Sequence, residues 1–426
     1  MPQKKEALKT LRTSLLSRGF SLAKASLRPG RMNQIEAIVK ELGQLKGSAM
    51  KVGQTLSMYG EHLLPKEVTE MLKTLQSNAA PLSWAPIAQV LQEELGAELL
   101  AELEVEPEAL GAASIGQVHR ARVKATGEEL VLKVQYPGVS EAIASDLKLL
   151  KFFLNMSELV PRGPRFDQIF EEIKEMLAQE IDYTIERRFL DSFYDVLKSD
   201  KRYLLPKSFS RYSTRRVLAM EKVCGVRVDS PEVQALSLER RNALGLAYFD
   251  LYMRELLELR QVQTDPHLGN YLIRVDESGA DQLVLFDFGA VRAVPKPFLK
   301  HYYMMMSGGV QRDPRLIEIG GRQFGLLQPE DKIDLVRDFC NLVILILEPF
   351  SSGVYDWGAS DLPKRVAKQV SHIAFSYKLR APPRELVFLD RKLGGAFMFL
   401  SGLKCVVDAR PVLERHLARV KVELGG

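Results

Sequence analysis

Hydrophobic and polar positions follow two different periods along this 426-residue chain. From residue 32 to about 108, apolar residues recur three and four positions apart, which predicts helices throughout. Between 109 and about 223 the period changes, because Gly116–Val123 and Leu130–Val134 are short valine-rich runs typical of strands. Residues 226–426 return to the helical period, apart from one hairpin. The chain is therefore predicted to be an α+β protein, with a small mixed part between two helical parts.

Turn and breaker residues set the expected ends of the elements. A helix over Trp84–Leu95 should stop at Gly96, and Ala125-Thr126-Gly127 should separate the two valine-rich strands. Further along we expect helices over about 140–157 and Phe166–Leu197, a strand over Arg215–Glu221, and a hairpin that pairs Tyr271–Val275 with Gln282–Phe286.

Length and composition narrow the class of protein. At about 150 residues per domain, the chain has room for two or three domains or for one two-lobed unit. The chain has 46% hydrophobic and 27% charged residues, a composition that excludes a collagen, a disordered tail and a coiled-coil rod. The longest apolar stretch, Phe339–Leu347, is far shorter than the roughly 20 residues of a spanning helix. Three separated cysteines without a CxxC pair favour a reducing compartment, and no secretory pattern opens the chain.

The positive charge is concentrated at the start of the chain. Residues 1–31 contain eight Lys or Arg and one Glu, whereas the remainder is close to neutral. This gives no sign of a nucleic-acid groove, so no nucleic-acid partner is expected. The segment has a leucine stripe at helical spacing, and three explanations remain open: a membrane-surface anchor, an organelle targeting peptide, or a solvated helix packed on the body.

Polar residues gather at the ends of the predicted hairpin. Asp265 and Asn270 precede its first strand, and Asp287-Phe288-Gly289 follows its second, so one end of the hairpin should bring three oxygen donors together. Such donors suit Mg²⁺, and the order D-x-x-x-x-N, hairpin, DFG is that of a kinase catalytic site. The alternative is a polar turn at each end of an ordinary hairpin.

A second group of candidates lies in the mixed part. Lys133 stands near the middle of an apolar strand, where a buried ammonium needs an anionic partner, unless the strand is an edge facing solvent. Glu180 and Asp182 on the next long helix are the candidate partners. Upstream, the small residues Ala112, Ala113 and Ser114 would let backbone N–H groups approach a phosphate, although the loop is not G-x-G-x-x-G.

These residues, taken in order, resemble the UbiB family of atypical kinase-like proteins, also called aarF-domain-containing kinases. The resemblance covers nearly the whole chain after about residue 35 and is closest to the subgroup associated with coenzyme Q biosynthesis. The segments that carry it are Lys51-Val52-Gly53-Gln54 (K-x-G-Q), Ala112–His119, Lys133–Val139, Glu180-Ile181-Asp182 (E-x-D), Gln263-Thr264-Asp265, Leu285–Ala290, Pro382–Glu385 and Arg391–Gly395.

The resemblance implies a bilobal, protein-kinase-like fold with an N-terminal helical extension folded over the active site. We expect a basic segment over 1–31, the extension over 32–108, an N-lobe over 109–223 and a mainly helical C-lobe over 224–426. It also implies binding of ATP or ADP with Mg²⁺, and support of ubiquinone biosynthesis or lipid handling. Expected partners are nucleotide, anionic lipid, isoprenoid quinone intermediates and biosynthetic enzymes. The expected location is cytoplasmic, peripheral on the inner membrane, and mitochondrial in a eukaryote.

Each candidate residue then has an expected role. Lys133 would hold the α- and β-phosphates with Glu180 orienting it, Asp265 would act as base or water-orienting group, and Asn270 and Asp287 would bind Mg²⁺. We place Glu221, at the end of its predicted strand, with the nucleotide-binding residues Ala112, Ala113 and Ser114. The resemblance puts Lys51 and Gln54, which share one helix face, over the active site. Asp182 and Glu186 form a further acidic candidate site, unless Glu186 makes a surface salt bridge to an Arg.

Some features depart from an ordinary protein kinase. Gln263 stands where most protein kinases have His, and no A-P-E segment follows Asp287, which argues against peptide docking. His119 and His267 could form a metal pair, but no third ligand has suitable spacing, which favours local hydrogen bonding instead.

Two other functions stay open: a nucleotide-gated lipid-binding or scaffold protein, and a small-molecule phosphotransferase.

Overall fold

The computed structural model describes residues 81–113, 115–156, 164–265, 267–351, 353–377 and 382–423. The chain forms two units: one comprises the N-terminal part to Arg188 with Lys207–Lys222, and the other comprises Phe189–Pro206 with the chain from Val223 onward. Within the described residues, no helix is both long and apolar enough to cross a membrane. The predicted segment 1–31 and most of the predicted extension, 32–108, lie outside the described residues.

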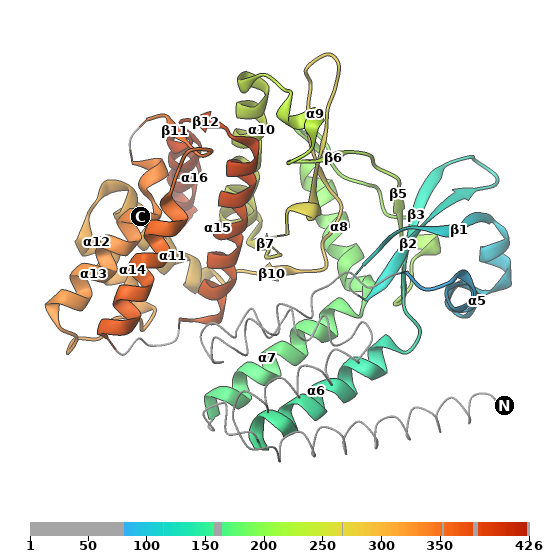
Figure 1. The fold of residues 1–426 in the computed structure, drawn as a ribbon, viewed down its shortest axis with the longest axis horizontal. Coiled ribbons are helices and arrows are strands. Elements are labelled where there is room, and N and C mark those ends of the chain that lie inside the picture. The colour runs from blue at the N-terminus through green and yellow to red at the C-terminus, as the bar shows by residue number, and fades with distance from the viewer. Residues whose placement is uncertain are drawn as a thin grey trace. The chain divides into compact units, whose positions relative to one another are not determined.

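The described residues of the first unit form one antiparallel sheet (Figure 1). Its strands are β1 (Leu103–Ala112), β2 (Gly116–Val123), β3 (Glu129–Gln135) and β5 (Val217–Glu221), in the order β1-β2-β3-β5. β2 and β3 have the alternating and valine-rich patterns of strands that bury a face, and Gly127 (φ +75°) provides the turn between them. The predicted strands in this part are thus confirmed.

Helix α5 (Trp84–Ala101) and β1 change the boundary expected at residue 108. Ile87, Leu91 and Leu103 are buried in the same hydrophobic cluster as Leu130 and Leu132 of β3. The range 84–108 therefore packs as part of the N-lobe core, and its last residues form a strand where we expected a helix. A break at Gly96 is present (φ 73°, ψ 172°), but α5 resumes and ends at Ala101.

The helices that follow the sheet also differ from the prediction. The first unit contains α6 (Val139–Met156), α7 (Pro164–Glu180) and the short turn η1 (Ser210–Tyr212), while α8 (Tyr183–Leu197) begins in this unit and ends in the second. The single helix expected over Phe166–Leu197 is therefore wrong. The chain leaves the helical course at Ile181-Asp182, and the Asp182 carboxylate then caps a new helix by accepting from the backbone N–H of Thr184 at 3.0 Å.

Helices dominate the described part of the second unit, which also contains three small sheets. One sheet has the order β4 (Tyr203–Leu204), β9 (Gln282–Leu285), β8 (Tyr271–Arg274), β6 (Val226–Arg227); the other two pair β7 (Gln261–Gln263) with β10 (Val291–Ala293) and β11 (Tyr355–Asp356) with β12 (Val406–Val407). The predicted hairpin is β8–β9, in which Tyr271 pairs with Leu285 and Arg274 with Gln282.

The helices of the second unit enclose an apolar core. They are α9 (Pro231–Gln234), α10 (Leu238–Met253), the π-helical turn η2 (Arg254–Leu259), η3 (Leu268–Asn270), α11 (Lys296–Gln311), α12 (Pro314–Gln323), α13 (Ile333–Ile346), η4 (Glu348–Phe350), α14 (Leu362–Ser376), α15 (Arg384–Leu403) and α16 (Arg410–Glu423). α10 is buried along most of its length and lies beside α15 (Figure 1), where Tyr248 stacks on Phe399 with ring centroids 4.1 Å apart. The burial of α10 along most of its length is therefore that of a central core helix.

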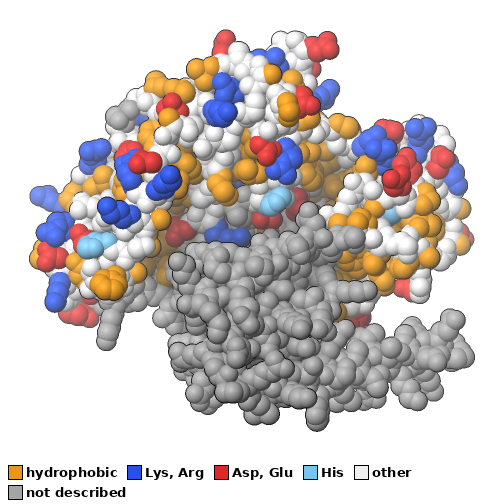
Figure 2. Space-filling view, viewed as in Figure 1, with side chains coloured by type: hydrophobic (Ala, Val, Ile, Leu, Met, Phe, Trp, Pro, Cys, Tyr) orange, Lys and Arg blue, Asp and Glu red, His pale blue; other side chains and the backbone are white. Residues whose placement is uncertain are grey.

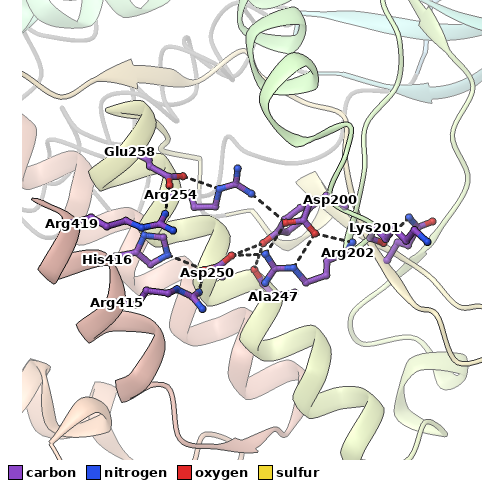
Figure 3. Close-up of polar contacts among 12 residues, drawn as sticks. Asp200, Lys201, Arg202, Ala247, Asp250, Arg254, Glu258, Arg415, His416 and Arg419 are labelled. Carbon is purple, nitrogen blue, oxygen red and sulfur yellow. Dashed lines mark hydrogen bonds and ion pairs between the residues drawn. The ribbon is translucent and has the colours of Figure 1, made fainter.

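A charged cluster ties α10 to the C-terminal helix (Figure 3). The buried Asp250 carboxylate accepts from Arg202 at 2.7 Å, from Arg415 at 2.5 Å and is 2.8 Å from His416 Nε2. Burial opposes ionisation of Asp250, but the hydrogen bonds from His416 and Arg202 outweigh it and lower its pKa. Because Arg202 precedes β4, the cluster joins three segments that are far apart in the sequence.

Candidate functional site

The strand lysine has an anionic partner in the first unit. Lys133 Nζ lies 2.8 Å and 3.0 Å from the two carboxylate oxygens of Glu186, and the two side chains are 12% and 4% exposed. Its ammonium also lies 5.2 Å from the ring centre of Tyr183. Lys133 is on β3 between β2 and β5, so the alternative of an edge strand facing solvent is wrong.

Glu186 takes the place that we expected Glu180 to fill. Glu180 is the last residue of α7, whereas Glu186 is in the first turn of α8. The expected Lys133–Glu180 pair is therefore replaced by Lys133–Glu186, and the surface salt bridge considered for Glu186 is also excluded by its burial. The sequence did contain a signal for the break, since Asp182 followed by Thr184 is typical of a helix start.

The remaining first-unit candidates lie along the same sheet. Ala112 ends β1, and the backbone N–H of Ala113 donates to Gly116 O at 2.8 Å, which closes the turn to β2; Ser114 lies outside the described residues. Gly116 lies so close to β3 that a Cβ there would be 2.2 Å from Val134 O. Glu221 ends β5, directly before the chain crosses to the second unit.

The catalytic-loop candidates are in contact in the second unit. The Asp265 carboxylate accepts from the Asn270 side-chain amide at 2.9 Å and from the His267 backbone N–H at 3.2 Å. Asn270 ends the short turn η3, directly before β8. The amide nitrogen of Asn270 is used by Asp265, so its oxygen remains the group that can bind a cation.

Asp287 follows β9, and Gln263 links it to the same loop. The Gln263 side-chain amide donates to Asp287 O at 2.7 Å, and its oxygen accepts from the Asp265 backbone N–H at 3.0 Å. The sequence marks Gln263 only as a replacement for His, but in the structure it joins both halves of the candidate site. Phe288 packs on Phe193 of α8, with ring centroids 4.9 Å apart.

The donors present fit a magnesium ion bound together with phosphate. No group of three or more His, Cys, Asp or Glu side chains suited to a metal occurs in the part of the chain that the structure describes. Mg²⁺ does not require such a cage, because it usually binds one or two carboxylates, phosphate oxygens and water. The Asp287 carboxylate and the Asn270 amide oxygen would supply the protein ligands.

The two candidate metal histidines have local partners. His119 is buried on β2, 2.9 Å from the Gln117 side-chain amide and 2.9 Å from Glu106 O. His267 Nδ1 accepts from the Gly269 backbone N–H at 3.1 Å. These contacts support local hydrogen bonding rather than a shared metal.

The connection between Asp287 and helix α11 is short. Gly289 donates its backbone N–H to the Asp287 carboxylate, β10 pairs with β7, and α11 begins at Lys296. The connection from Asp287 to α11 therefore consists of residues 288–295, with the short strand β10 within it.

Comparison with known proteins places the chain in a family. A family model described as the ABC1 atypical kinase-like domain matches residues 74–318, which is more than half of the chain. The chain belongs to the ABC1 atypical kinase-like family. The predictions of an atypical kinase-like enzyme and of a kinase-like α+β fold are thereby confirmed.

Two relatives with names of the COQ8 type match along more than two thirds of their own length. The chain is 32% identical over 383 residues to "Atypical kinase COQ8B, mitochondrial" of Rattus norvegicus, covering 89% of this chain and 71% of the relative. It is 30% identical over 390 residues to "Atypical kinase COQ8, mitochondrial" of Saccharomyces cerevisiae, covering 91% and 76%.

A solved structure agrees with the ABC1 fold. The complex of Rv3197 with erythromycin from Mycobacterium tuberculosis is similar with a TM-score of 0.62 at 23% identity, covering 96% of this chain and 97% of that one. At this identity the likeness concerns the fold alone. Lys51 and Gln54, which the K-x-G-Q motif would put over the active site, lie outside the described residues.

Proposed function

We propose that this ABC1-family chain binds ATP with Mg²⁺ and transfers or hydrolyses its γ-phosphoryl group. The observation that carries the proposal is the contact of Asp265 with Asn270, joined through Gln263 to Asp287. Kinase-like catalysis depends on positioning and on charge neutralisation, and these are the groups that it requires.

The proposed roles follow from the chemistry of each side chain. Asp287 and Asn270 would bind Mg²⁺, and Asp265 would orient the attacking hydroxyl or water. Lys133 would contact the α- and β-phosphates, with Glu186 rather than Glu180 holding its ammonium. Ala112, Ala113 and Ser114 would bring backbone N–H groups to the phosphates, and Glu221 would lie near the nucleotide base.

A separate protein is a poor candidate for the phosphoryl acceptor. The short connection from Asp287 to α11 leaves no activation segment on which a peptide could dock. The acceptor would then be water or a small molecule. Lys51 and Gln54 of the K-x-G-Q segment would restrict access to the site.

We further propose that the chain supports ubiquinone biosynthesis at a membrane surface, where isoprenoid intermediates and biosynthetic enzymes are found. Two of its relatives are named as the mitochondrial atypical kinases COQ8 and COQ8B. The basic residues of segment 1–31 would attract anionic lipid, at about 1 kcal/mol for each residue that reaches the surface. On the face that Figure 2 shows, basic and acidic side chains of the described residues are interspersed, whereas residues 1–31 carry eight Lys or Arg and one Glu.

Binding to vesicles would test the membrane proposal. Full-length protein should co-sediment with anionic vesicles, and salt should weaken the binding because ions screen the charge term within about 8–10 Å. A chain starting at Asn33 should sediment less. Equal sedimentation of both chains would contradict the role of the basic segment.

Replacing Asp287 tests the nucleotide proposal. Asp287→Asn removes an anionic metal ligand, so the affinity for MgATP measured by calorimetry should fall about tenfold or more. Asp276→Asn is a matched control, since Asp276 is in the turn at the other end of the β8–β9 hairpin. Unchanged MgATP affinity in Asp287→Asn would reject the assignment.

Replacing Asp265 separates catalysis from a scaffold function. Asp265→Asn should bind MgATP but lose turnover. If cells that lack the wild-type protein were fully complemented by this variant, the function would be that of a nucleotide-gated scaffold.

A further inference from the structure

The second unit contains an ion pair that is almost completely removed from water. Lys392 of α15 and Glu255 of η2 are 1% and 2% exposed, and Lys392 Nζ lies 2.8 Å from Glu255 Oε2. Burying two charges costs several kcal/mol per ion, which their mutual attraction offsets only if further hydrogen bonds complete the site. The other partners of the two side chains therefore indicate what the pair does.

Lys392 holds the residue that follows Asn270. Its ammonium donates to the Tyr271 hydroxyl at 2.7 Å and lies 5.1 Å from the centre of the same ring. The rings of Tyr248 and Tyr252 lie 5.7 Å and 5.9 Å from it. Three aromatic rings and a hydroxyl thus fix the ammonium, and through it the position of Tyr271, in a buried site.

Glu255 holds the other end of the same loop. Its carboxylate accepts from the backbone N–H of Gln263 at 3.2 Å. The side chain of Gln263 in turn contacts the Asp265 backbone N–H and Asp287 O. One buried ion pair therefore contacts both ends of the loop that carries Asp265 and Asn270.

The backbone around Glu255 is adapted to this contact. Glu255 lies in the wide π-helical turn η2, and Arg260 directly after that turn has φ +53°, a conformation unusual for a residue with a side chain. The reversal brings β7 back beside η2, so that Gln263 reaches Glu255. Such turns are frequent at functional sites.

We infer that Lys392 and Glu255 are positioning residues, which hold the 263–271 loop so that Asp265, Asn270 and Asp287 keep the arrangement needed for MgATP. This inference rests on the function proposed above. Lys392 is more than 100 residues from the loop in sequence, and it belongs to the Arg391–Gly395 segment, to which the proposed chemistry gave no role. Neither residue contacts the reacting atoms, so their effect is exerted through Tyr271 and Gln263.

The test must separate positioning from a contribution to stability. A single substitution would leave one charge buried and unpaired, which destabilises strongly. We therefore choose the double variant Glu255→Leu with Lys392→Met, which removes both charges. Its matched control is Asp281→Leu with Arg240→Met, a pair joined by two hydrogen bonds at the turn end of the same hairpin, in which Asp281 is 4% exposed.

Three measurements are made on each full-length protein: the midpoint of thermal unfolding, hydrogen exchange of residues 261–274 without nucleotide, and MgATP affinity with turnover. In the Glu255/Lys392 double variant, exchange at 263–271 should accelerate and turnover should fall about 10- to 100-fold, because small displacements of catalytic groups have effects of that size. The control should change exchange only near its own turn and should keep the parental turnover.

The results distinguish the two proposals. Parental turnover and exchange in a folded Glu255/Lys392 double variant would overturn the positioning role, as would equal losses in the control. If the parent protein itself fails to bind MgATP, the proposed function is rejected, while the exchange data still decide whether the pair orders the loop. If the double variant does not fold, Tyr271→Phe decides. Its unfolding midpoint should fall because the buried Lys392 ammonium loses a hydrogen bond, and its turnover, measured well below that midpoint, should be several-fold lower. Parental turnover in this variant overturns the inference.

Discussion

We propose that Lys133 contacts the nucleotide phosphates, so its carboxylate partner is the residue expected to affect nucleotide binding. Glu180 and Glu186 are six residues apart, and both stand in a strongly acidic stretch of sequence. The Glu186 carboxylate is within hydrogen-bond distance of the Lys133 ammonium, and it is nearly buried. A charge-assisted hydrogen bond in such a place contributes about 1.5–3 kcal/mol, more than an exposed ion pair would.

Glu186→Gln should therefore lower MgATP affinity about tenfold or more, because Lys133 loses its fixed position. Glu129→Gln is the control, since Glu129 is an exposed carboxylate on the same strand β3, paired with Lys222. Titration of MgATP into each variant would show the difference. If Glu186→Gln bound as tightly as the parent, the ion pair would have no part in nucleotide binding.

At the level of elements, the close approach of β2 to β3 sets the position of the lysine strand. Gly116 pairs with Gln135, two residues after Lys133, and its missing side chain lets the two backbones meet. A Cβ at Gly116 would lie 2.2 Å from Val134 O, so the strands would have to separate. Gly111, at the other end of the same turn, has no atom within 4 Å of an added Cβ.

This contrast predicts different outcomes for the same substitution. Gly116→Ala should lower the free energy of unfolding by about 1–3 kcal/mol, the usual effect of overpacking, and should weaken MgATP binding because Lys133 moves. Gly111→Ala should leave the free energy of unfolding nearly unchanged. Chemical denaturation of both variants gives the comparison, and equal stabilities would show that β2 and β3 are not in close contact at Gly116.

For the molecule as a whole, the Asp250 cluster makes stability depend on pH. Asp250 is surrounded by Arg202 from the segment before β4 and by Arg415 and His416 from α16 (Figure 3). The Tyr203 hydroxyl also donates to its carboxylate at 3.4 Å. Its pKa is lower in the folded state than in the unfolded chain. Its contribution to folding is therefore complete above the unfolded pKa of about 3.9 and is lost as the pH falls below that value.

We expect the free energy of unfolding to decrease below about pH 4, and Asp250→Asn to remove part of that decrease. At neutral pH the variant should be less stable by about 3–5 kcal/mol, because the surrounding cations lose a buried partner. Denaturation between pH 3 and 7 would test this, with Glu239→Gln, an exposed change on the same helix, as the control. A variant with the parental pH dependence would contradict the assignment.

The sequence by itself determined the local features of this protein. Valine-rich alternation predicted β2 and β3, and two polar turns around β8–β9 predicted the contact between Asp265 and Asn270. These features are local because period, turn residues and short spacings decide them. The order of the motifs was also sufficient to indicate the family to which the chain belongs.

Only the tertiary structure decided which distant residues meet. It placed α5 and β1 in the N-lobe core, selected Glu186 for Lys133, and brought Lys392 to Glu255. Periodicity shows that a helix has a buried face but does not show what that face packs against. A buried charge likewise needs a partner, yet several carboxylates along one chain satisfy the requirement equally until packing brings one of them within hydrogen-bond distance.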